Sequence, residues 1–169
     1  SEKKVHTYVK LNPTLLGYEY VQSVFRQQEF DHIQLTEESF SHDMQYDDAI
    51  EMIRSLQAFA KETGVDFGVK LSNTLPVVNE KGMLPTPEMY MSGRALYPLT
   101  VNLSHKLAQE FGGEIVISYS GGATYFNIED LFNSGIKPIT LATELLKPGG
   151  YSRLNQLAKI LESPMADNP

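Results

Sequence analysis

The chain has 169 residues, and its 14 lysines and arginines against 21 aspartates and glutamates give a formal net charge of −7. A protein that binds a nucleic-acid backbone through its overall charge is therefore not expected, and any anion site must be local. Hydrophobic residues make up 41% of the sequence, which suffices for a buried core and argues against a disordered chain. The absence of cysteine excludes disulfides, thiolate metal sites and thiol catalysis within this sequence.

Short apolar runs alternate with segments of helical periodicity along the chain. This order predicts an α/β fold with a parallel sheet and outer helices. The expected strands are, in chain order, 8–11, 32–35, 67–71, 114–119 and 138–142. Helices are expected after Gly17, before Gly64, from Pro98 to Phe111, at Asn127–Phe132 and after Gly150. The segment Thr74–Tyr97, rich in proline and glycine, is expected to form a long functional loop, and residues 163–169 to fray.

One internal repeat bears on the architecture. The tripeptide Val9-Lys10-Leu11 recurs as Val69-Lys70-Leu71, an offset of 69 − 9 = 60 residues. Two strand–helix units fit this offset, and alternate strands of a (β/α)₈ barrel supply the same interior layer, so Lys10 and Lys70 would be near neighbours. A chance match of a common strand sequence accounts for the repeat equally well. Because a full barrel takes about 250 residues, the chain is either a complete open sheet or the C-terminal part of a barrel.

Two successive strand ends carry the strongest chemical signal. The first is Ser118-Tyr119-Ser120-Gly121-Gly122, and the second is Ile139-Thr140-Leu141-Ala142-Thr143. Loops after the last two strands of a barrel can surround a phosphate with backbone N–H groups, and glycine permits close approach. The pattern therefore predicts a ligand that bears a phosphate. The alternative is that the two glycines merely turn the chain.

Other candidate residues lie on the strands and the long loop. Lys10 and Lys70 each stand between apolar residues, which predicts that they point into the barrel toward an anion, unless their stems pack and their ammonium groups reach water. Asn73 follows a strand, and Gly93-Arg94 closes the long loop, where the arginine either clamps an anion or ties down the loop. The four histidines show no ligand spacing, so no metal site is predicted.

Three stretches resemble the last strands of dihydroorotate dehydrogenase-like flavin barrels, which include dihydropyrimidine dehydrogenase. They are Met91–Leu99, Ile117–Gly122 and Ile139–Leu146. Three further stretches, Tyr8–Pro13, Phe67–Thr74 and Pro148–Tyr151, are similar to the selenate reductase subunit family. This second similarity extends over nearly the whole chain.

The resemblance implies that residues 1–169 are a single partial-barrel domain, the C-terminal part of a TIM (β/α)₈ barrel with about five parallel strands. It implies a fragment of a larger oxidoreductase whose iron–sulfur clusters lie outside this chain. A cytoplasmic location is expected separately, because the sequence shows neither a signal-peptide pattern nor a membrane-spanning run. Gly121, Gly122 and Thr143 would hold the FMN phosphate, Gly93 would lie near the ribityl chain, and Lys10 would contact the flavin. Lys70 and Asn73 are assigned to the same site.

Two departures from the family pattern stand out. Ala142 occupies the position where such barrels usually have glycine, and its Cβ is expected to narrow the phosphate pocket. The chain also offers no cysteine, and no serine that matches the usual acid/base, so the catalytic residue is unknown. Two alternatives therefore stay open: a flavin-free structural or docking barrel module, and a phosphosugar-binding barrel enzyme.

The expected partners follow from the partial barrel. They are the remaining modules of the same polypeptide or complex, and further copies of the chain that pair with open sheet edges. Neither a nucleic acid nor a membrane is expected as a partner, since the charge is acidic and no apolar run approaches about 18 residues.

Overall fold

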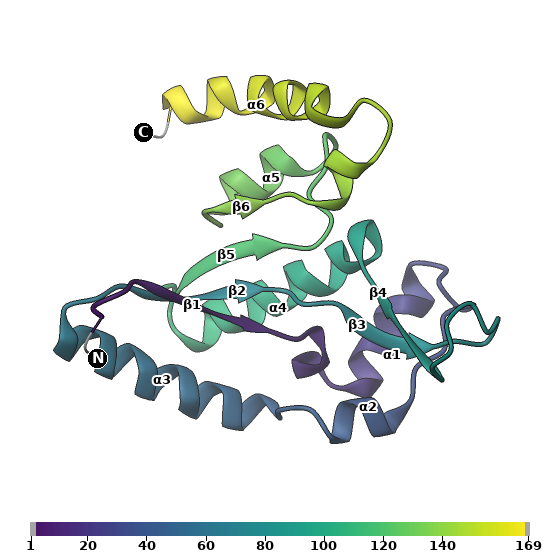
Figure 1. The fold of residues 1–169 in the computed structure, drawn as a ribbon. Coiled ribbons are helices and arrows are strands. Elements are labelled where there is room, and N and C mark those ends of the chain that lie inside the picture. The colour runs from purple at the N-terminus through teal and green to yellow at the C-terminus, as the bar shows by residue number, and fades with distance from the viewer. Residues whose placement is uncertain (1–2, 168–169) are drawn as a thin grey trace.

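A computed structural model describes residues 3–167, with side chains as far as residue 162. Its main sheet has four strands, β1 (Thr7–Leu11), β2 (Phe67–Leu71), β5 (Val116–Ser120) and β6 (Ile139–Thr140). They are all parallel and lie in the order β1-β2-β5-β6 (Figure 1). The predicted α/β class with a parallel sheet is confirmed, as a partial barrel of four parallel strands rather than five.

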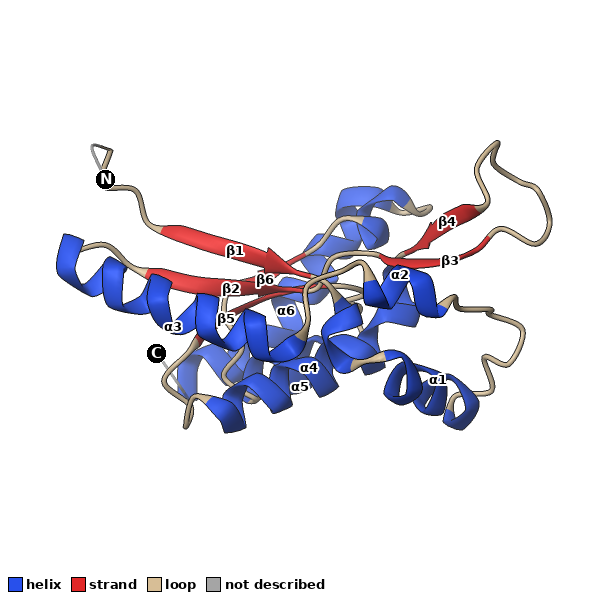
Figure 2. Ribbon diagram, turned by 90° about the horizontal axis from the view of Figure 1, so that it is seen from below, coloured by secondary structure: helices blue, strands red, loops and turns tan. Residues whose placement is uncertain are grey.

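The helices gather on one side of this sheet. They are α1 (Tyr18–Gln27), α2 (Glu37–Ser41), α3 (Tyr46–Thr63), α4 (Tyr97–Glu110), α5 (Ile128–Asn133) and α6 (Gly150–Asp167). Figure 2 shows α1, α3 and α4 along one face of β1 and β2, and among the described residues no helix runs along the opposite face of these two strands. The core lies between these layers, and Val69, Leu71, Leu99 and Leu103 are fully buried there. The open face is the one that would line the interior of a closed barrel.

The two copies of the repeat lie side by side. Strands β1 and β2 pair so that Val9 is opposite Val69, Lys10 opposite Lys70 and Leu11 opposite Leu71. Since partners in a parallel pair share a face, both lysines lie on the open face and both leucines enter the core. The expectation that the lysines are neighbours is confirmed, but they stand on adjacent strands rather than alternate ones.

The predicted strand at 32–35 is wrong. His32 lies in a turn and residues 33–35 belong to no helix or strand; among the described residues, the backbone link of this segment to a strand is the N–H of Val78 donating to the carbonyl of Gln34 at 2.9 Å. Ile33 and Leu35 still pack against the core. An apolar run becomes a strand only where it pairs along a sheet edge, and 32–35 meets the hairpin at Val78 instead of pairing with β1.

The predicted loop at Thr74–Tyr97 is in large part a hairpin. Strand β3 (Leu75–Val78) pairs antiparallel with β4 (Glu88–Met91), and this arm extends from the sheet (Figures 1 and 2). The turn residues fall in the connection between the strands, where the amide of Asn79 donates to the carbonyls of Leu84 and Thr86 at 2.8 Å each. Leu75 and Val77 are buried, so packing forms strands that the composition alone does not reveal.

Three short 3₁₀ helices each begin within three residues of a strand's carboxyl end: η1 (Pro13–Leu16) after β1, η2 (Gly93–Leu96) after β4 and η3 (Thr143–Leu146) after β6. The C-terminal helix α6 runs to Asp167, so the chain is helical through much of the segment expected to fray, and residues 168–169 lie outside the described part. Among residues 3–167, no helix has both the length and the apolar character that crossing a membrane requires.

Candidate functional site

A cavity of about 330 Å³ lies at the carboxyl ends of the parallel strands. Seven of the eight predicted cofactor-binding residues line it: Lys10, Lys70, Gly93, Gly121, Gly122, Ala142 and Thr143. They come from separate parts of the chain, which the carboxyl edge of the sheet brings together. This is where open and barrel α/β sheets place their ligands. We call this cavity the glycine pocket.

Hydrogen bonds from nearby side chains hold the turn after β5 in place. Gly121 and Gly122 have φ values of +139° and +80°, which side chains rarely adopt. The fully buried Tyr119 donates its hydroxyl to the carbonyl of Gly121 at 2.6 Å, and the amide of Asn127 donates to the carbonyl of Gly122 at 3.1 Å. Burial raises the pKa of the Tyr119 phenol, so this donor keeps its proton at neutral pH. Both glycine carbonyls are therefore occupied by side chains.

The N–H groups of the same turn have no such partners. Within the described residues, those of Gly121, Gly122 and Ala123 donate to no acceptor. Successive N–H groups in a turn with positive φ values form a concavity that suits an anion. The backbone N–H groups that the predicted phosphate site requires therefore have no other acceptor among the described residues.

Glycine at position 122 also has a packing role that the sequence did not show. A Cβ at this position would come within 2.5 Å of the carbonyl oxygen of Gly93 and 2.7 Å of the Cα of Arg94. The turn after β5 thus lies directly against η2. Close approach of two chain segments requires this glycine whether or not a ligand is bound.

Ala142 and Thr143, which follow β6, also line the pocket. Thr143 is exposed, and its hydroxyl makes no hydrogen bond to any described side chain or backbone group. A Cβ on Gly93 would be 3.4 Å from the methyl group of Thr143, so these two residues lie close together in the lining of the pocket. Ala142 has a φ of −138°, so the backbone here does not lie in the left-handed region that favours glycine.

Positive charge surrounds the pocket although the chain as a whole is acidic. Its lining contains Lys10, Lys70, Arg94 and Lys147 against one carboxylate, that of Glu144. Among the described residues, neither Lys10 nor Lys70 forms an ion pair. Like charges directly opposite each other on neighbouring strands are unfavourable, and an anion between them would offset the repulsion. The lining of the pocket is therefore net positive, in contrast to the chain as a whole.

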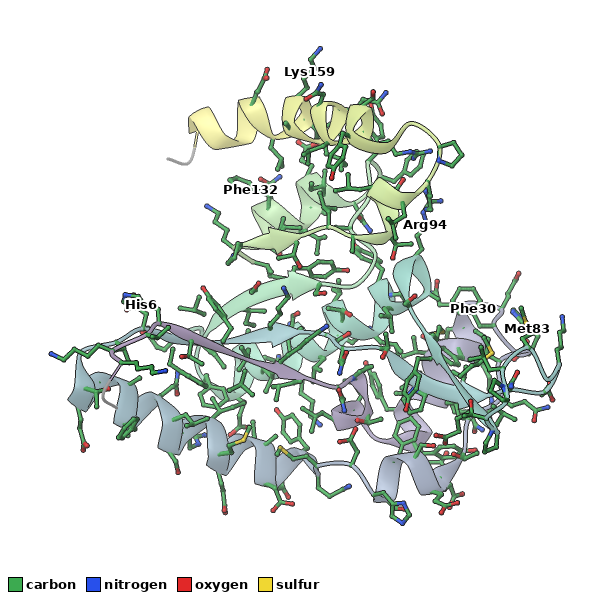
Figure 3. The ribbon with its side chains drawn as sticks, in the orientation of Figure 1. His6, Phe30, Met83, Arg94, Phe132 and Lys159 are labelled. Atoms are coloured by element: carbon green, nitrogen blue, oxygen red, sulfur yellow. The ribbon has the colours of Figure 1, made fainter. Side chains whose placement is uncertain are left out.

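The carboxylate of Glu144 lies close to three cations, Arg94, Lys147 and Arg153. The sequence alone did not identify Glu144 as a candidate residue. Glu144 is only 5% exposed, and it accepts from Lys147 at 2.7 Å and from Arg153 at 2.6 Å. The guanidinium of Arg94 lies 3.6 Å away, between the chain leading to α6 and the start of α4 (Figure 3). The hydrogen bond from Lys147 lowers the pKa of Glu144, against the effect of burial. The i,i+3 spacing of Glu144 and Lys147 is the only local signal that could have pointed to this cluster.

Asn73 is the one predicted residue outside the glycine pocket. It lines a neighbouring cavity of about 620 Å³ below the hairpin, and Thr74 borders both cavities. Asn12 lines the same second cavity, but its amide donates to Asp43 at 2.7 Å, so it serves the local structure. Among the described residues, no group of three or more histidine and acidic side chains could hold a metal ion.

Comparison with known proteins extends this picture. The model of a family described as the N-terminal TIM-barrel domain of oxidoreductase YgfK matches residues 1–168. The chain is 54% identical over 161 residues to "Putative oxidoreductase YgfK" of Escherichia coli strain K12, and equally to that of E. coli O157:H7. The match covers 95% of the chain but only 16% of each relative.

A solved structure also shows partial similarity. It is a ligand-free type DHODH from Eimeria tenella, with 23% identity and a TM-score of 0.45, covering 66% of this chain and 32% of that one.

Proposed function

We propose that this chain, which belongs to the family of N-terminal TIM-barrel domains of YgfK-type oxidoreductases, is a flavin-binding module that takes FMN in the glycine pocket. One observation carries the proposal. The N–H groups of Gly121, Gly122 and Ala123 have no acceptor among the described residues, and these three residues line a pocket that also contains four cations. Such a site is suited to a phosphate monoester attached to a larger ring system.

The residues divide into two roles. The turn at Gly121–Ala123 and the hydroxyl of Thr143 would hold the phosphate, since these donors have no other partner among the described residues. Lys10 and Lys70, on the open face of β1 and β2, would place positive charge beside the ring. FMN, when bound, supplies hydride and single-electron transfer. A lysine pair at the ring favours extra electron density there and so makes the bound flavin easier to reduce.

We propose further that the substrate chemistry belongs to the larger protein. The chain corresponds to 16% of its curated relatives, and a selenate reductase-type activity with iron–sulfur centres would reside in modules beyond it. The open sheet face and the strand edges would contact those modules or another copy of the chain. Cytoplasmic location is part of the same proposal.

The test is a titration of the purified chain with FMN and with riboflavin, followed by flavin fluorescence. We expect saturable FMN binding and at least about tenfold weaker riboflavin binding, because riboflavin lacks the charged group. Thr143→Ala should weaken FMN about fivefold and leave riboflavin unchanged, while Thr143→Ser retains the hydroxyl and the affinity.

Three results would count against the proposal. Equal affinity for the two flavins would mean that the glycine turn is not a phosphate site. Binding of neither would favour a flavin-free structural module. Displacement of FMN by ribose 5-phosphate at equal concentration would favour a phosphosugar-binding barrel.

A further inference from the structure

A further groove shares Glu144 with the glycine pocket. Its volume is about 630 Å³, and it is bordered by the Tyr125–Phe126 loop and by α6, which contributes Arg153 and Gln156. Arg94 and Glu144 line both this groove and the glycine pocket. The two sites are therefore contiguous, and we call the second one the aromatic groove.

The charges around Glu144 do not balance. One carboxylate, 5% exposed, faces Lys147, Arg153 and Arg94, which leaves a local charge of 3 − 1 = +2. Lys147 lines only the glycine pocket, and Arg153 lines only the aromatic groove. Of the three cations around Glu144, one therefore belongs to each site and Arg94 is shared, while Lys159 adds a further cation to the lining of the aromatic groove.

The N–H donors of the Arg94 guanidinium have no hydrogen-bond acceptor among the described residues. It lies 3.6 Å from Glu144, and it makes no hydrogen bond to any side chain or backbone group that the structure describes. Its side chain is 56% exposed. Arg153, by contrast, uses its Nε and one terminal nitrogen on Pro148 and Glu144, which holds the side chain in place and leaves its other terminal nitrogen open. A planar fork with open donors is the geometry that binds phosphate oxygens in pairs.

Two aromatic rings form the other wall of the groove. Tyr125 is 55% exposed and Phe126 is 79% exposed, and their rings lie edge to face with centroids 5.6 Å apart. A phenylalanine this exposed buries little apolar surface in the chain itself. Every nucleobase has a face that can stack on such a ring, and loss of one stacking ring weakens binding by about tenfold.

We propose that the aromatic groove binds a purine nucleotide, with the base on Phe126 and Tyr125 and the phosphate on Arg94 and Arg153. Two sources would present this chemistry: the adenylate half of a flavin dinucleotide whose flavin half occupies the glycine pocket, or a separate nucleotide. The dinucleotide source rests on the proposed flavin function, whereas the separate nucleotide does not. Contiguity through Arg94 makes both sources sterically consistent with the lining of the two sites.

The experiment is calorimetric titration of the full chain with ADP, with and without saturating FMN. Adenosine and ribose 5-phosphate serve as probes that lack the phosphate and the base. We expect ADP to bind in both conditions and each partial probe to bind at least about tenfold more weakly. Arg153→Met and Phe126→Ala should each weaken ADP about tenfold.

Matched controls separate the groove from general surface effects. Arg54 pairs with Glu110 at 2.8 Å on the other side of the molecule, and Tyr151 is 80% exposed outside the groove lining. Arg54→Met and Tyr151→Ala should therefore leave ADP affinity unchanged. Since Arg153 also holds Glu144, the exposed Phe126→Ala variant keeps the test decisive if Arg153→Met loses structure.

A titration with FAD then identifies the source. FAD binding about tenfold tighter than FMN, with the advantage lost in Phe126→Ala, would identify the dinucleotide. FAD no tighter than FMN, with ADP bound beside FMN, would identify a separate nucleotide.

The proposal is overturned by any of three results: no saturable ADP binding together with equal affinities for FAD and FMN, displacement of ADP by FMN, or ADP affinity unchanged in Phe126→Ala. If ADP binds but FMN does not, the proposed flavin function fails while this inference stands.

Discussion

The carboxyl edge of the sheet carries two cavities that share Thr74 and differ sharply in charge. The glycine pocket, at the β5–β6 end, is lined by four cations and one carboxylate. The cavity below the hairpin contains no lysine or arginine among its described lining, and its carboxylates are Glu38, Asp43 and Glu88. Asp43 is already occupied by Asn12 and Thr14, and Glu88 by Ser39. Ligand preference is therefore set by local charge at each strand end, and the net charge of −7 describes neither cavity.

The largest expected effect is at the turn that defines the glycine pocket. Gly122→Ala should lower the free energy of unfolding by about 3 kcal/mol and abolish FMN binding, because its Cβ would collide with backbone atoms of Gly93 and Arg94. Gly113→Ala is the matched control. Gly113 has nearly the same φ, +82°, with no atom within 4 Å of the added Cβ, so it should cost only about 1 kcal/mol. Denaturant unfolding measures both, and equal losses would contradict the packing role of Gly122.

An intermediate effect is expected from the buried carboxylate between the two ligand sites. Glu144→Gln should lower stability at neutral pH by about 1–2 kcal/mol, since the cations around it lose their partner. Because the folded state lowers the pKa of Glu144, its contribution is fully present above the unfolded value near 4.5 and is lost as pH falls from there through the lower pKa of the folded state. The difference between wild type and variant should therefore shrink in unfolding experiments as the pH is lowered from neutral to about 3. A difference that is the same at both pH values would show that this carboxylate is not the titrating group.

The smallest effects are expected from single substitutions in the linings of the two cavities, which allow a direct comparison of their roles in FMN binding. Lys10→Met and Lys70→Met should each weaken FMN about tenfold, while the free chain becomes slightly more stable because two like charges are no longer opposed. Asp43→Asn, in the cavity below the hairpin, should leave FMN affinity unchanged and reduce stability through its bonds to Asn12 and Thr14. Fluorescence titration measures the affinity for FMN, and thermal unfolding measures the stability of the free chain. Loss of FMN binding in Asp43→Asn would mean that the two cavities act as one site.

Local sequence was sufficient for much of the fold. The strands at β1 and β2 and the helices α3, α4, α5 and α6 follow from apolar periodicity and from glycines that end or begin them. The prediction of a strand at 32–35 and the prediction of a long loop at Thr74–Tyr97 were wrong for the same reason. A short apolar run carries no information about which sheet edge is free, so pairing with a distant segment decides whether it becomes a strand.

The chain's own sequence determined which residues could bind an anion: the glycine turn at 121–122, Thr143, and the two lysines that the repeat displays. Their convergence in one pocket was decided by the tertiary structure, because parallel strands bring their carboxyl ends to a common edge whatever their separation along the chain. The position of Asn73 in a second cavity and the gathering of Arg94, Lys147 and Arg153 around Glu144 were likewise tertiary results. Charge pairing across separate segments depends on distances in space, and a single sequence does not contain them.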